Sequence, residues 1–390
     1  MDKRPSARPL RVVFWGTYDT GKPRVRILLD GLRLNEVEVI ECHYDLWSGI
    51  EDKSQVKGVG RWIRLLTRMA VAYPSLIWRY LRLPHHDVVM VLYPGLIDLF
   101  IIRSFTWLRR KPLVWDWFLS AYDTIVLDRR LLNRRNPLAW IIRAIEWAAS
   151  RLVDAAFMDT AAHARRMEHL FGLSAGTLRH AWVGVEREHF APHIGGCRHR
   201  TCAGEVQVLF YGQFIPLHGI TTIVAAAGLL RDQPVCWQLI GRGQEAPRIR
   251  RLLELDPLPK LHWREWIDYT ELGQAMSKAD VVLGIFGTSD KAASVIPNKV
   301  FQIIAARRAL ITRDSPAIRE LLADMPLAVQ LVPPGDAHAL AAAVRGFVDA
   351  AAAGADIEGP HITDEFDAAA IGKQLSDILL PLLKKGTDSR

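Results

Sequence analysis

A stretch in the second half of the sequence combines a proline, two lysines and an apolar helical pattern. Pro297, Asn298 and Lys299 follow a polar segment that contains Lys291, and the apolar pattern begins at Val300. Proline suits the first position of a helix, where its missing N–H is not needed. The unpaired N–H groups of a helix start attract a phosphate, but only by about 0.3–2 kcal/mol, so we expect the lysines to contribute. The alternative is a buried helix start with a solvated lysine.

The composition describes a globular chain with a basic balance. Its 390 residues are half hydrophobic and predict two or three domains. Four scattered cysteines form no disulfide framework and favour a reducing cytoplasm. The N-terminus has no apolar signal region, and the longest apolar run, 88–102, is shorter than the ~20 residues of a spanning helix. The net charge of +8 predicts an anionic partner, either phosphates, nucleic acid or an acidic membrane face.

The first predicted strand, 11–16, ends in a glycine-rich loop. Residues 16–23 match the spacing of a phosphate-binding P-loop except at the last position, where Pro23 has neither a hydroxyl nor an N–H. We therefore interpret the segment as a glycine-rich loop that lines a ligand cleft, with Gly16 and Thr17 as candidate donor-binding residues.

Two segments of the first half combine arginines with tryptophan and leucine. In the first, Arg61, Arg64 and Arg68 share one helical face, and no acidic residue occurs from Arg61 to Arg82. Residues 129–151 repeat this composition. Basic amphipathic helices of this kind are typical of membrane surfaces, so we expect membrane contact. The alternative is an ordinary amphipathic helix with a solvated basic face.

Two aspartates follow the predicted strand 112–115. Asp116 comes directly after this strand, and Asp123 lies in the loop beyond it. Because ligands bind at the carboxyl ends of parallel strands, Asp116 is a candidate general base or substrate anchor, and Asp123 is a second catalytic candidate. Capping or turn aspartates are the alternative.

The alternation of strands and helices predicts doubly wound α/β domains. The pattern stops at 191–205, which we interpret as a linker. His193, Cys197, His199 and Cys202 lie there in no standard zinc spacing, so we predict no metal site. The pattern restarts at 206, and Gly241-Arg242-Gly243 loosely matches a dinucleotide fingerprint. We expect domains at 1–190 and 206–360, both Rossmann-like and facing across a cleft, and a helix in 361–390 that packs back towards the first domain.

The second half resembles the GT-B glycosyltransferases, in particular the retaining group called family 4. The likeness rests on Gly184-Val185-Glu186 with Phe190 and Pro192, on 211–220, on 239–243, on Ala279-Asp280-Val281 with 297–302, and on 331–336. Four positions depart from the family pattern. Gln213 and His218 stand where Arg and Lys bind the donor diphosphate. Ser294 and Gln302 stand where the family has two glutamates.

The resemblance implies that a sugar is transferred from a UDP- or GDP-linked donor, with no cofactor. No Asp-x-Asp metal motif of the other glycosyltransferase fold occurs in the sequence, so we predict no required divalent metal. The negative charge that develops on the leaving phosphate would be stabilised by helix N–H groups and lysines. An inverting reaction needs a base such as Asp116, whereas in a retaining one the leaving phosphate itself takes the proton. The expected donor-binding residues are Gly16, Thr17, Gln213, His218, Gly241, Arg242, Lys291, Pro297, Asn298, Lys299 and Gln302.

We therefore predict a cytoplasmic glycosyltransferase, peripheral on the inner face of the cell membrane, in cell-envelope polysaccharide or glycolipid synthesis. Its partners would be a nucleotide sugar, a lipid-linked or amphipathic acceptor and an anionic membrane surface, with no nucleic acid. A nucleotide- or sugar-binding relative without turnover is one alternative, suggested by Gln213, His218 and Gln302. A nucleic-acid-binding protein is another, for which a steep loss of affinity with salt would be expected.

Overall fold

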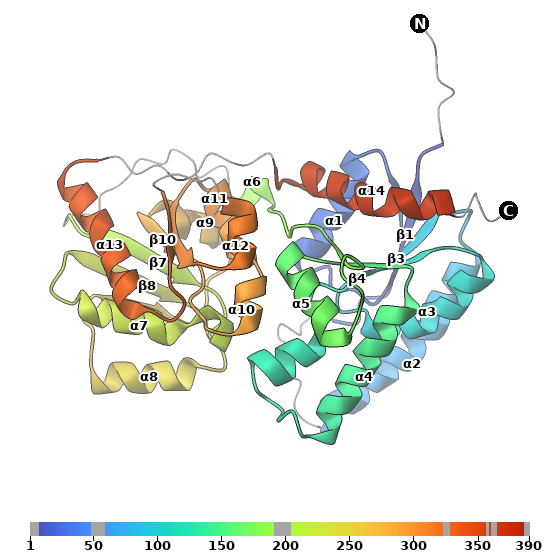
Figure 1. The fold of residues 1–390 in the computed structure, drawn as a ribbon, viewed down its shortest axis with the longest axis horizontal. Helices are drawn as coiled ribbons and strands as arrows, with labels where there is room; N and C mark the ends of the chain where they lie inside the picture. The colour runs from blue at the N-terminus through green and yellow to red at the C-terminus, as the bar shows by residue number, and fades with distance from the viewer. Residues whose placement is uncertain are drawn as a thin grey trace, which may run out of the picture. The chain divides into compact units, whose positions relative to one another are not determined.

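The chain forms two compact units (Figure 1). The computed structural model describes residues 8–47, 59–190, 204–322, 328–355, 359 and 365–385. Unit 1 comprises Met1–Gly184 and Phe366–Arg390, and unit 2 comprises Val185–Glu365. The predicted linker at 191–205 and its histidines and cysteines fall almost wholly outside the described residues.

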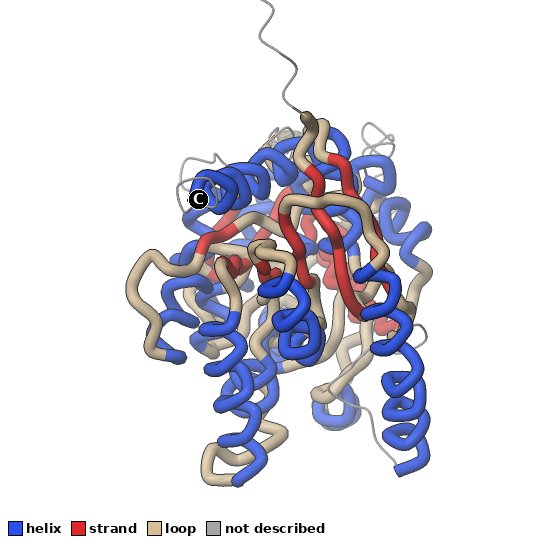
Figure 2. The backbone as a smooth tube through the Cα atoms, turned by 90° about the vertical axis from the view of Figure 1, so that its right-hand side faces the viewer, coloured by secondary structure: helices blue, strands red, loops and turns tan. Residues whose placement is uncertain are grey.

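Unit 1 is built on a parallel sheet of six strands in the order β2-β1-β3-β4-β5-β6. Figure 2 faces this unit and shows the strands between helices. The strands are β1 (Arg11–Gly16), β2 (Glu38–His43), β3 (Val88–Val91), β4 (Leu113–Asp116), β5 (Ala155–Met158) and β6 (Arg179–His180). The helices are α1 (Pro23–Leu34), α2 (Val59–Leu81), α3 (Leu96–Leu108), the π-helical turn η2 (Asp123–Asp128), α4 (Pro137–Leu152), α5 (Ala161–Phe171) and α14 (Ala368–Lys385).

Alternate residues of the strands separate the two faces of this sheet. Val13 and Trp15 of β1 share one apolar core with residues of α2, α3, α4 and α5, so these four helices cover one face. The outer faces of α2, α3 and α4 are described below, because they carry an unusual set of side chains.

Helices α1 and α14 pack against each other at two glycines. A Cβ added to Gly372 would lie 1.9 Å from the carbonyl oxygen of Gly31, and one added to Gly31 would lie 2.4 Å from that of Ala368. Asn35 Nδ2 also donates to the Ala369 carbonyl at 2.8 Å. The last helix of the chain is therefore an integral part of unit 1 (Figure 1).

Unit 2 has the same architecture, with a parallel sheet in the order β12-β11-β10-β7-β8-β9. Its strands are β7 (Val206–Tyr211), β8 (Val235–Ile240), β9 (Leu261–Arg264), β10 (Val281–Leu283), β11 (Ala309–Arg313) and β12 (Val329–Val332). Its helices are α6 (Arg187–Phe190), η4 (Pro216–His218), α7 (Ile220–Leu229), α8 (Ala246–Leu255), α9 (Tyr269–Ser277), α10 (Asp290–Ser294), α11 (Asn298–Ala305), α12 (Pro316–Leu322) and α13 (Ala337–Ala352). The predicted fold class, two doubly wound α/β domains, is confirmed.

Two details of the sequence interpretation change. Helix α11 begins at Asn298, and Pro297 is its N-cap residue with extended backbone rather than the first helical residue. In the second basic segment only Pro137–Leu152 is helical, because Asn136 caps this helix by accepting a hydrogen bond from the Leu138 N–H. None of the described helices combines the length and apolar character needed to cross a membrane.

Candidate active site

In unit 2, three loops at the carboxyl ends of the strands meet around Gly212. This residue follows β7 with φ +139°, a conformation that favours glycine. An added Cβ would lie 3.0 Å from His218 Cε1 and 3.1 Å from Lys299 Nζ, so a side chain here would displace both groups. The loop after β8 also approaches closely, since a Cβ on Gly241 would meet the Gly212 carbonyl oxygen. The structure thus brings four of the predicted residues together around Gly212. They are Gln213, His218, Gly241 and Lys299.

Lys299 reaches this point from the first turn of α11. Its side chain is buried, and Nζ lies 3.3 Å from the Gly284 carbonyl oxygen and 3.8 Å from the centre of the Phe210 ring. Burial lowers the pKa of the Lys299 ammonium well below its usual range. An amine held at this point, beside Gly212 and the start of α11, is suited to contact a bound phosphate.

His218 lies at the end of η4 and is largely buried. Its Nδ1 contacts the backbone carbonyl of Gln213, so this nitrogen carries the proton of the neutral ring. A second proton on Nε2 makes the ring a cation. The two residues that replace the family's Arg and Lys are thus joined to each other through the Gln213 backbone.

Gln302 is held by two tyrosines. Its Oε1 accepts from the Tyr211 hydroxyl at 2.8 Å, and its Nε2 donates to the Tyr269 hydroxyl at 3.3 Å. The Tyr269 hydroxyl donates in turn to Glu186 Oε2 at 3.2 Å. These bonds use one of the two lone pairs of Oε1 and one of the two hydrogens of Nε2, and they fix the orientation of the amide. The sequence interpretation missed both tyrosines, although Tyr211 stands directly before the glycine at the strand end.

The remaining predicted residues of unit 2 lie on the loops around this point. Lys291 is buried on the short helix α10, whose N-cap Ser289 accepts from the Ala292 N–H. Arg242 is exposed after β8, and its guanidinium lies 5.1 Å from the centre of the Trp266 ring. Arg313 was not predicted. Its Nη1 donates to the carbonyls of Gly287 and Ser289, which fixes the polar loop that leads into α10.

One group of described residues in unit 2 has the ligand types of a metal site. Glu186, Glu188 and His189 each place one ligand atom within 4.8 Å of the others. Glu186 is already bonded to Tyr269, and the group is partly exposed.

In unit 1, the loop after β1 is closed onto a buried carboxylate. The Thr17 N–H donates to Asp98 Oδ2 at 2.6 Å, and the Thr17 hydroxyl donates to Asp98 Oδ1 at 3.1 Å. Gly16 has φ +123°, and a Cβ there would lie 2.1 Å from Asp98 Oδ2. The N–H and hydroxyl of Thr17 that we predicted to bind the donor are therefore engaged with Asp98, and Gly16 leaves the room that the Asp98 carboxylate occupies.

The burial of Asp98 predicts that the stability of the protein depends on pH. Burial raises the pKa of Asp98 from 3.8 to about 6, so the folded chain holds its proton more tightly than the unfolded chain. The protonated Asp98 contributes its full amount to the free energy of unfolding below about pH 4. This contribution, up to roughly 3 kcal/mol, is lost as the pH rises through about 6. The variant Asp98→Asn should lack this loss, so its stability relative to that of the native protein should rise from pH 4 to pH 7. Urea unfolding at several pH values, followed by tryptophan fluorescence, measures this difference, and a constant difference would contradict it.

Asp116 ends β4, where the sequence placed it, but it has a strong partner. Arg24 Nη2 donates to Asp116 Oδ1 at 2.8 Å, and Arg24 Nε lies 3.0 Å from the same oxygen. The exposed fractions of these side chains are 1% for Arg24 and 0% for Asp116. Arg24 Nη1 also donates to the Ala181 carbonyl at 3.1 Å. The geometry is that of a buried ion pair that joins α1 to the sheet, and the Asp116 carboxylate is occupied by Arg24 rather than exposed to a substrate.

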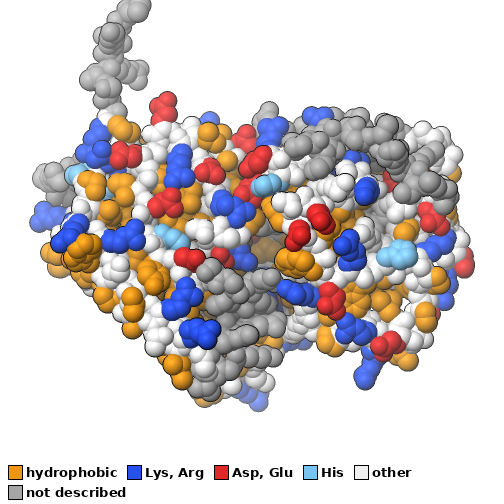
Figure 3. Space-filling model, turned by 180° about the vertical axis from the view of Figure 1, so that it is seen from behind, with side chains coloured by type: hydrophobic (Ala, Val, Ile, Leu, Met, Phe, Trp, Pro, Cys, Tyr) orange, Lys and Arg blue, Asp and Glu red, His pale blue; other side chains and the backbone are white. Residues whose placement is uncertain are grey.

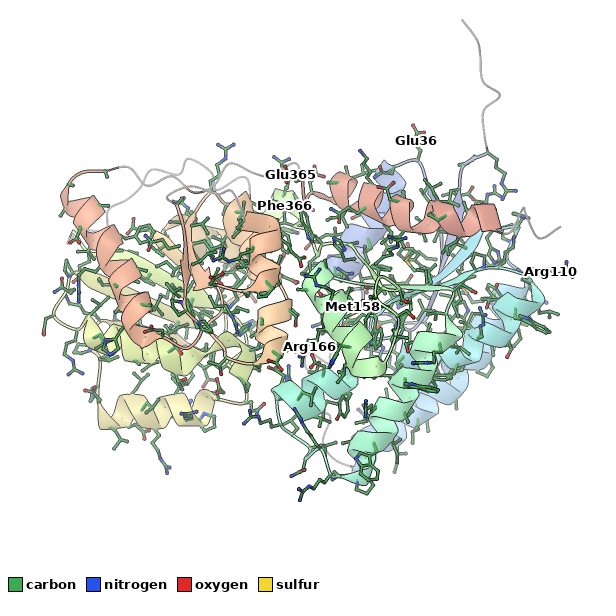
Figure 4. The ribbon with its side chains drawn as sticks, viewed as in Figure 1. Glu36, Arg110, Met158, Arg166, Glu365 and Phe366 are labelled. Atoms are coloured by element: carbon green, nitrogen blue, oxygen red, sulfur yellow. The ribbon has the colours of Figure 1, made fainter. Side chains whose placement is uncertain are left out.

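Asp123 begins η2 and is fully buried. Its Oδ1 accepts from Arg166 Nη2 of α5 at 2.7 Å, whereas its Oδ2 has no hydrogen-bond partner among the described residues (Arg166 is labelled in Figure 4). Glu146 of α4 fixes the approach to this turn, because its carboxylate accepts from the N–H groups of Ala121 and Tyr122 and from the Ser120 hydroxyl.

A histidine that the sequence interpretation missed lies after β5. His163 Nδ1 lies 2.6 Å from Asp159 Oδ1, both residues are buried, and His163 Nε2 has no partner among the described residues. A signal was available, since Asp159 directly follows a buried strand.

These two units together define the GT-B fold, which similar solved structures share. The sucrose-phosphate synthase of Thermosynechococcus elongatus matches 97% of this chain over 95% of its own, with a TM-score of 0.63 and 15% identity. HepE of Anabaena, in complex with UDP and glucose, matches 95% of this chain over 99% of its own, with a TM-score of 0.57 and 13% identity. The lipopolysaccharide outer core galactosyltransferase WaaB, in its apo form, matches 96% of this chain over 100% of its own, with a TM-score of 0.57 and 13% identity. At these identities the likeness shows the fold alone.

A family model matches part of unit 2. Residues 205–349 match the family described as glycosyl transferases group 1, which confirms the resemblance seen in the sequence of the second half. The matched residues include Gly212, His218, Gly241 and Lys299. No curated protein matches the sequence.

Proposed function

We propose that this protein is a glycosyltransferase that moves a sugar from a UDP- or GDP-linked donor to a lipid-linked or amphipathic acceptor. The observation that carries the proposal is the convergence of Lys299, His218 and the start of α11 on Gly212, inside the segment that matches the group 1 family. HepE, which shares the fold, has been solved with UDP and glucose bound.

Unit 2 would bind the donor diphosphate. The first N–H groups of α11, Lys299 and His218 can each approach an anion near Gly212. A diphosphate bound here would lie beside the positive charge of the Lys299 ammonium. That charge, together with the helix N–H groups, stabilises the leaving phosphate as the sugar bond breaks. Lys299 thus supplies the charge that the family pattern places at the positions of Gln213 and His218.

Unit 1 would bind the acceptor. Asp116 is committed to Arg24, whereas Asp123 keeps an oxygen without a hydrogen-bond partner. We propose that Asp116 shapes unit 1 and that Asp123 is the better candidate for contact with an acceptor hydroxyl. The leaving phosphate takes the proton if the anomeric configuration is retained, and a carboxylate takes it if the configuration is inverted.

The cellular setting that we propose is the inner face of the cell membrane, with the enzyme in the cytoplasm and active in cell-envelope polysaccharide or glycolipid synthesis. The arginine-rich helices of unit 1 support an anionic membrane rather than nucleic acid as partner, because apolar side chains lie among the arginines. The outer-core name of WaaB, which shares the fold, agrees with an envelope acceptor. We propose transfer without a required metal.

Ligand-dependent melting tests the donor site. UDP, GDP, ADP and dTDP are each added with magnesium and with EDTA, and a nucleotide at about one hundred times its Kd should stabilise the fold by about 2.7 kcal/mol. A shift with UDP or GDP that EDTA leaves unchanged is expected, and transfer from the corresponding nucleotide sugars is then measured. No shift with any nucleotide would contradict a donor site. A shift without hydrolysis or transfer would favour the non-catalytic binding protein.

A further inference from the structure

The outer faces of α2, α3 and α4 carry large apolar side chains in water. Most of the exposed large apolar side chains of the described chain lie on these three helices, including Trp78, Trp107, Trp140 and Trp147. The three helices contribute to one core on the same face of the sheet of unit 1. We call this surface the three-helix face. Figure 3 shows apolar and basic side chains next to one another at its lower left, in the part of unit 1 where Figure 1 places α2.

The charge of the three-helix face has one sign. Its helices contain two acidic residues, Asp98 and Glu146, and both are buried. Exposed arginines lie on the helices and at their ends, among them Arg64, Arg82, Arg110, Arg134 and Arg135. Apolar patches of this kind on a soluble domain mark interaction sites, and the excess of arginine requires an anionic partner.

The tryptophans have the environment of an interfacial side chain. The Arg82 guanidinium lies 3.6 Å from the centre of the Trp78 ring, and that of Arg151 lies 4.1 Å from the Trp147 ring. Tryptophan rings and arginine stems occur together where lipid headgroups meet acyl chains. Neither α2 nor any other described helix can span a bilayer, so this surface would lie in the headgroup layer.

We propose that the three-helix face docks on an anionic lipid bilayer, with Trp78, Trp107, Trp140 and Trp147 in the interfacial layer and the arginines against phosphate headgroups. A second copy of this chain is disfavoured, because a symmetric contact would set arginines against arginines. The inference deepens the proposed function, since it brings unit 1 to a lipid-linked acceptor. Its test nevertheless needs neither donor nor transfer.

Vesicle sedimentation tests the docking with the full chain. The protein is mixed with vesicles of phosphatidylcholine alone or with 30% phosphatidylglycerol, a composition chosen for the experiment, and the bound fraction is measured at low and high salt. Binding to the anionic vesicles that weakens in high salt is expected, together with tryptophan quenching by brominated acyl chains. Protein that stays in the supernatant with both vesicle types would overturn the proposal.

Two variants remove the two kinds of contact. In Trp107→Ser/Leu108→Ser, the exposed fractions of the native side chains are 75% and 70%, so the fold should be retained while binding falls by about tenfold or more. In Arg134→Gln/Arg135→Gln, the loss of two charges should weaken binding by about 30-fold. The matched control Leu34→Ser/Leu255→Ser removes side chains that are 64% and 78% exposed on α1 and α8 and should bind like the native protein.

The outcomes separate lipid from protein partners and from failure of the proposed function. Variants that bind vesicles as the native protein does would overturn the docking surface. So would a concentration-dependent dimer that Trp107→Ser/Leu108→Ser abolishes while no form binds vesicles. Melting shifts with nucleotide should be the same in the native protein and in Trp107→Ser/Leu108→Ser. If no nucleotide shifts the melting temperature, the donor site is contradicted, but the vesicle result still decides whether the three-helix face binds lipid.

Discussion

Replacing Arg24 by methionine is expected to lower the free energy of unfolding of unit 1 by about 3–5 kcal/mol. The change leaves Asp116 buried and charged without its partner, and the carbonyl of Ala181 also loses a donor. Burial already raises the pKa of Asp116, and the Arg24 guanidinium is the largest opposing influence. Urea unfolding at pH 7, followed by tryptophan fluorescence, measures the loss.

The double variant Arg24→Met/Asp116→Leu should recover much of this loss, because it removes both buried charges together. Arg231→Met is the matched control. Arg231 and Asp256 form an ion pair at 2.6 Å in which both side chains are well exposed, so the loss there should be below about 1 kcal/mol. An Arg24→Met protein that unfolds at the native urea concentration would contradict the structural role of the pair. In that case Asp116 would return as a candidate base.

Replacing Lys299 by methionine is expected to lower kcat/KM for the nucleotide sugar by about 100-fold or more, while the protein still folds. Methionine keeps most of the apolar length of the buried side chain, but it supplies no positive charge for the leaving phosphate. Folding should be little affected, because burial disfavours the charged form of Lys299, as its lowered pKa indicates, so the native state gains little stability from this charge.

Steady-state kinetics with the donor found by melting, and a melt without ligand, measure both parts of this prediction. Lys278→Met is the matched control, since Lys278 is exposed at the end of α9 in the same unit and should show native kinetics. An active Lys299→Met protein would assign the diphosphate charge to other residues, with Lys291 and Arg242 next to be tested. A protein that unfolds would make Lys299 a packing residue.

The order of elements and the ends of the strands could be predicted from the sequence, because they depend on local patterns. Asp116, Gly212 and Gly241 each stand at the carboxyl end of a strand, where the alternation of apolar residues stops. What each residue contacts could not be predicted in the same way. Arg24 appeared as one residue of a helix, and its partner Asp116 lies 92 positions later in the chain.

The contacts of the glycine-rich loop after β1 could not be predicted from the sequence either. Its spacing resembled a phosphate loop, but Thr17 gives its N–H and its hydroxyl to Asp98, 81 positions away. The tyrosines that hold Gln302 and the arginine that fixes the loop before α10 were missed for the same reason. Pairings between distant strands and helices follow from the fold, and no local period in the sequence encodes them.

The contact between α1 and α14 has a consequence for the order in which the protein is made. A ribosome completes unit 2 before it releases the residues that finish unit 1, because unit 1 takes its last helix from beyond residue 365. Until then, the surface of α1 around Gly31 lacks the helix that approaches it at Gly372. The amino-terminal unit therefore reaches its complete set of contacts only after the residues beyond 365 have been synthesised, so the unit that is begun first is completed after unit 2.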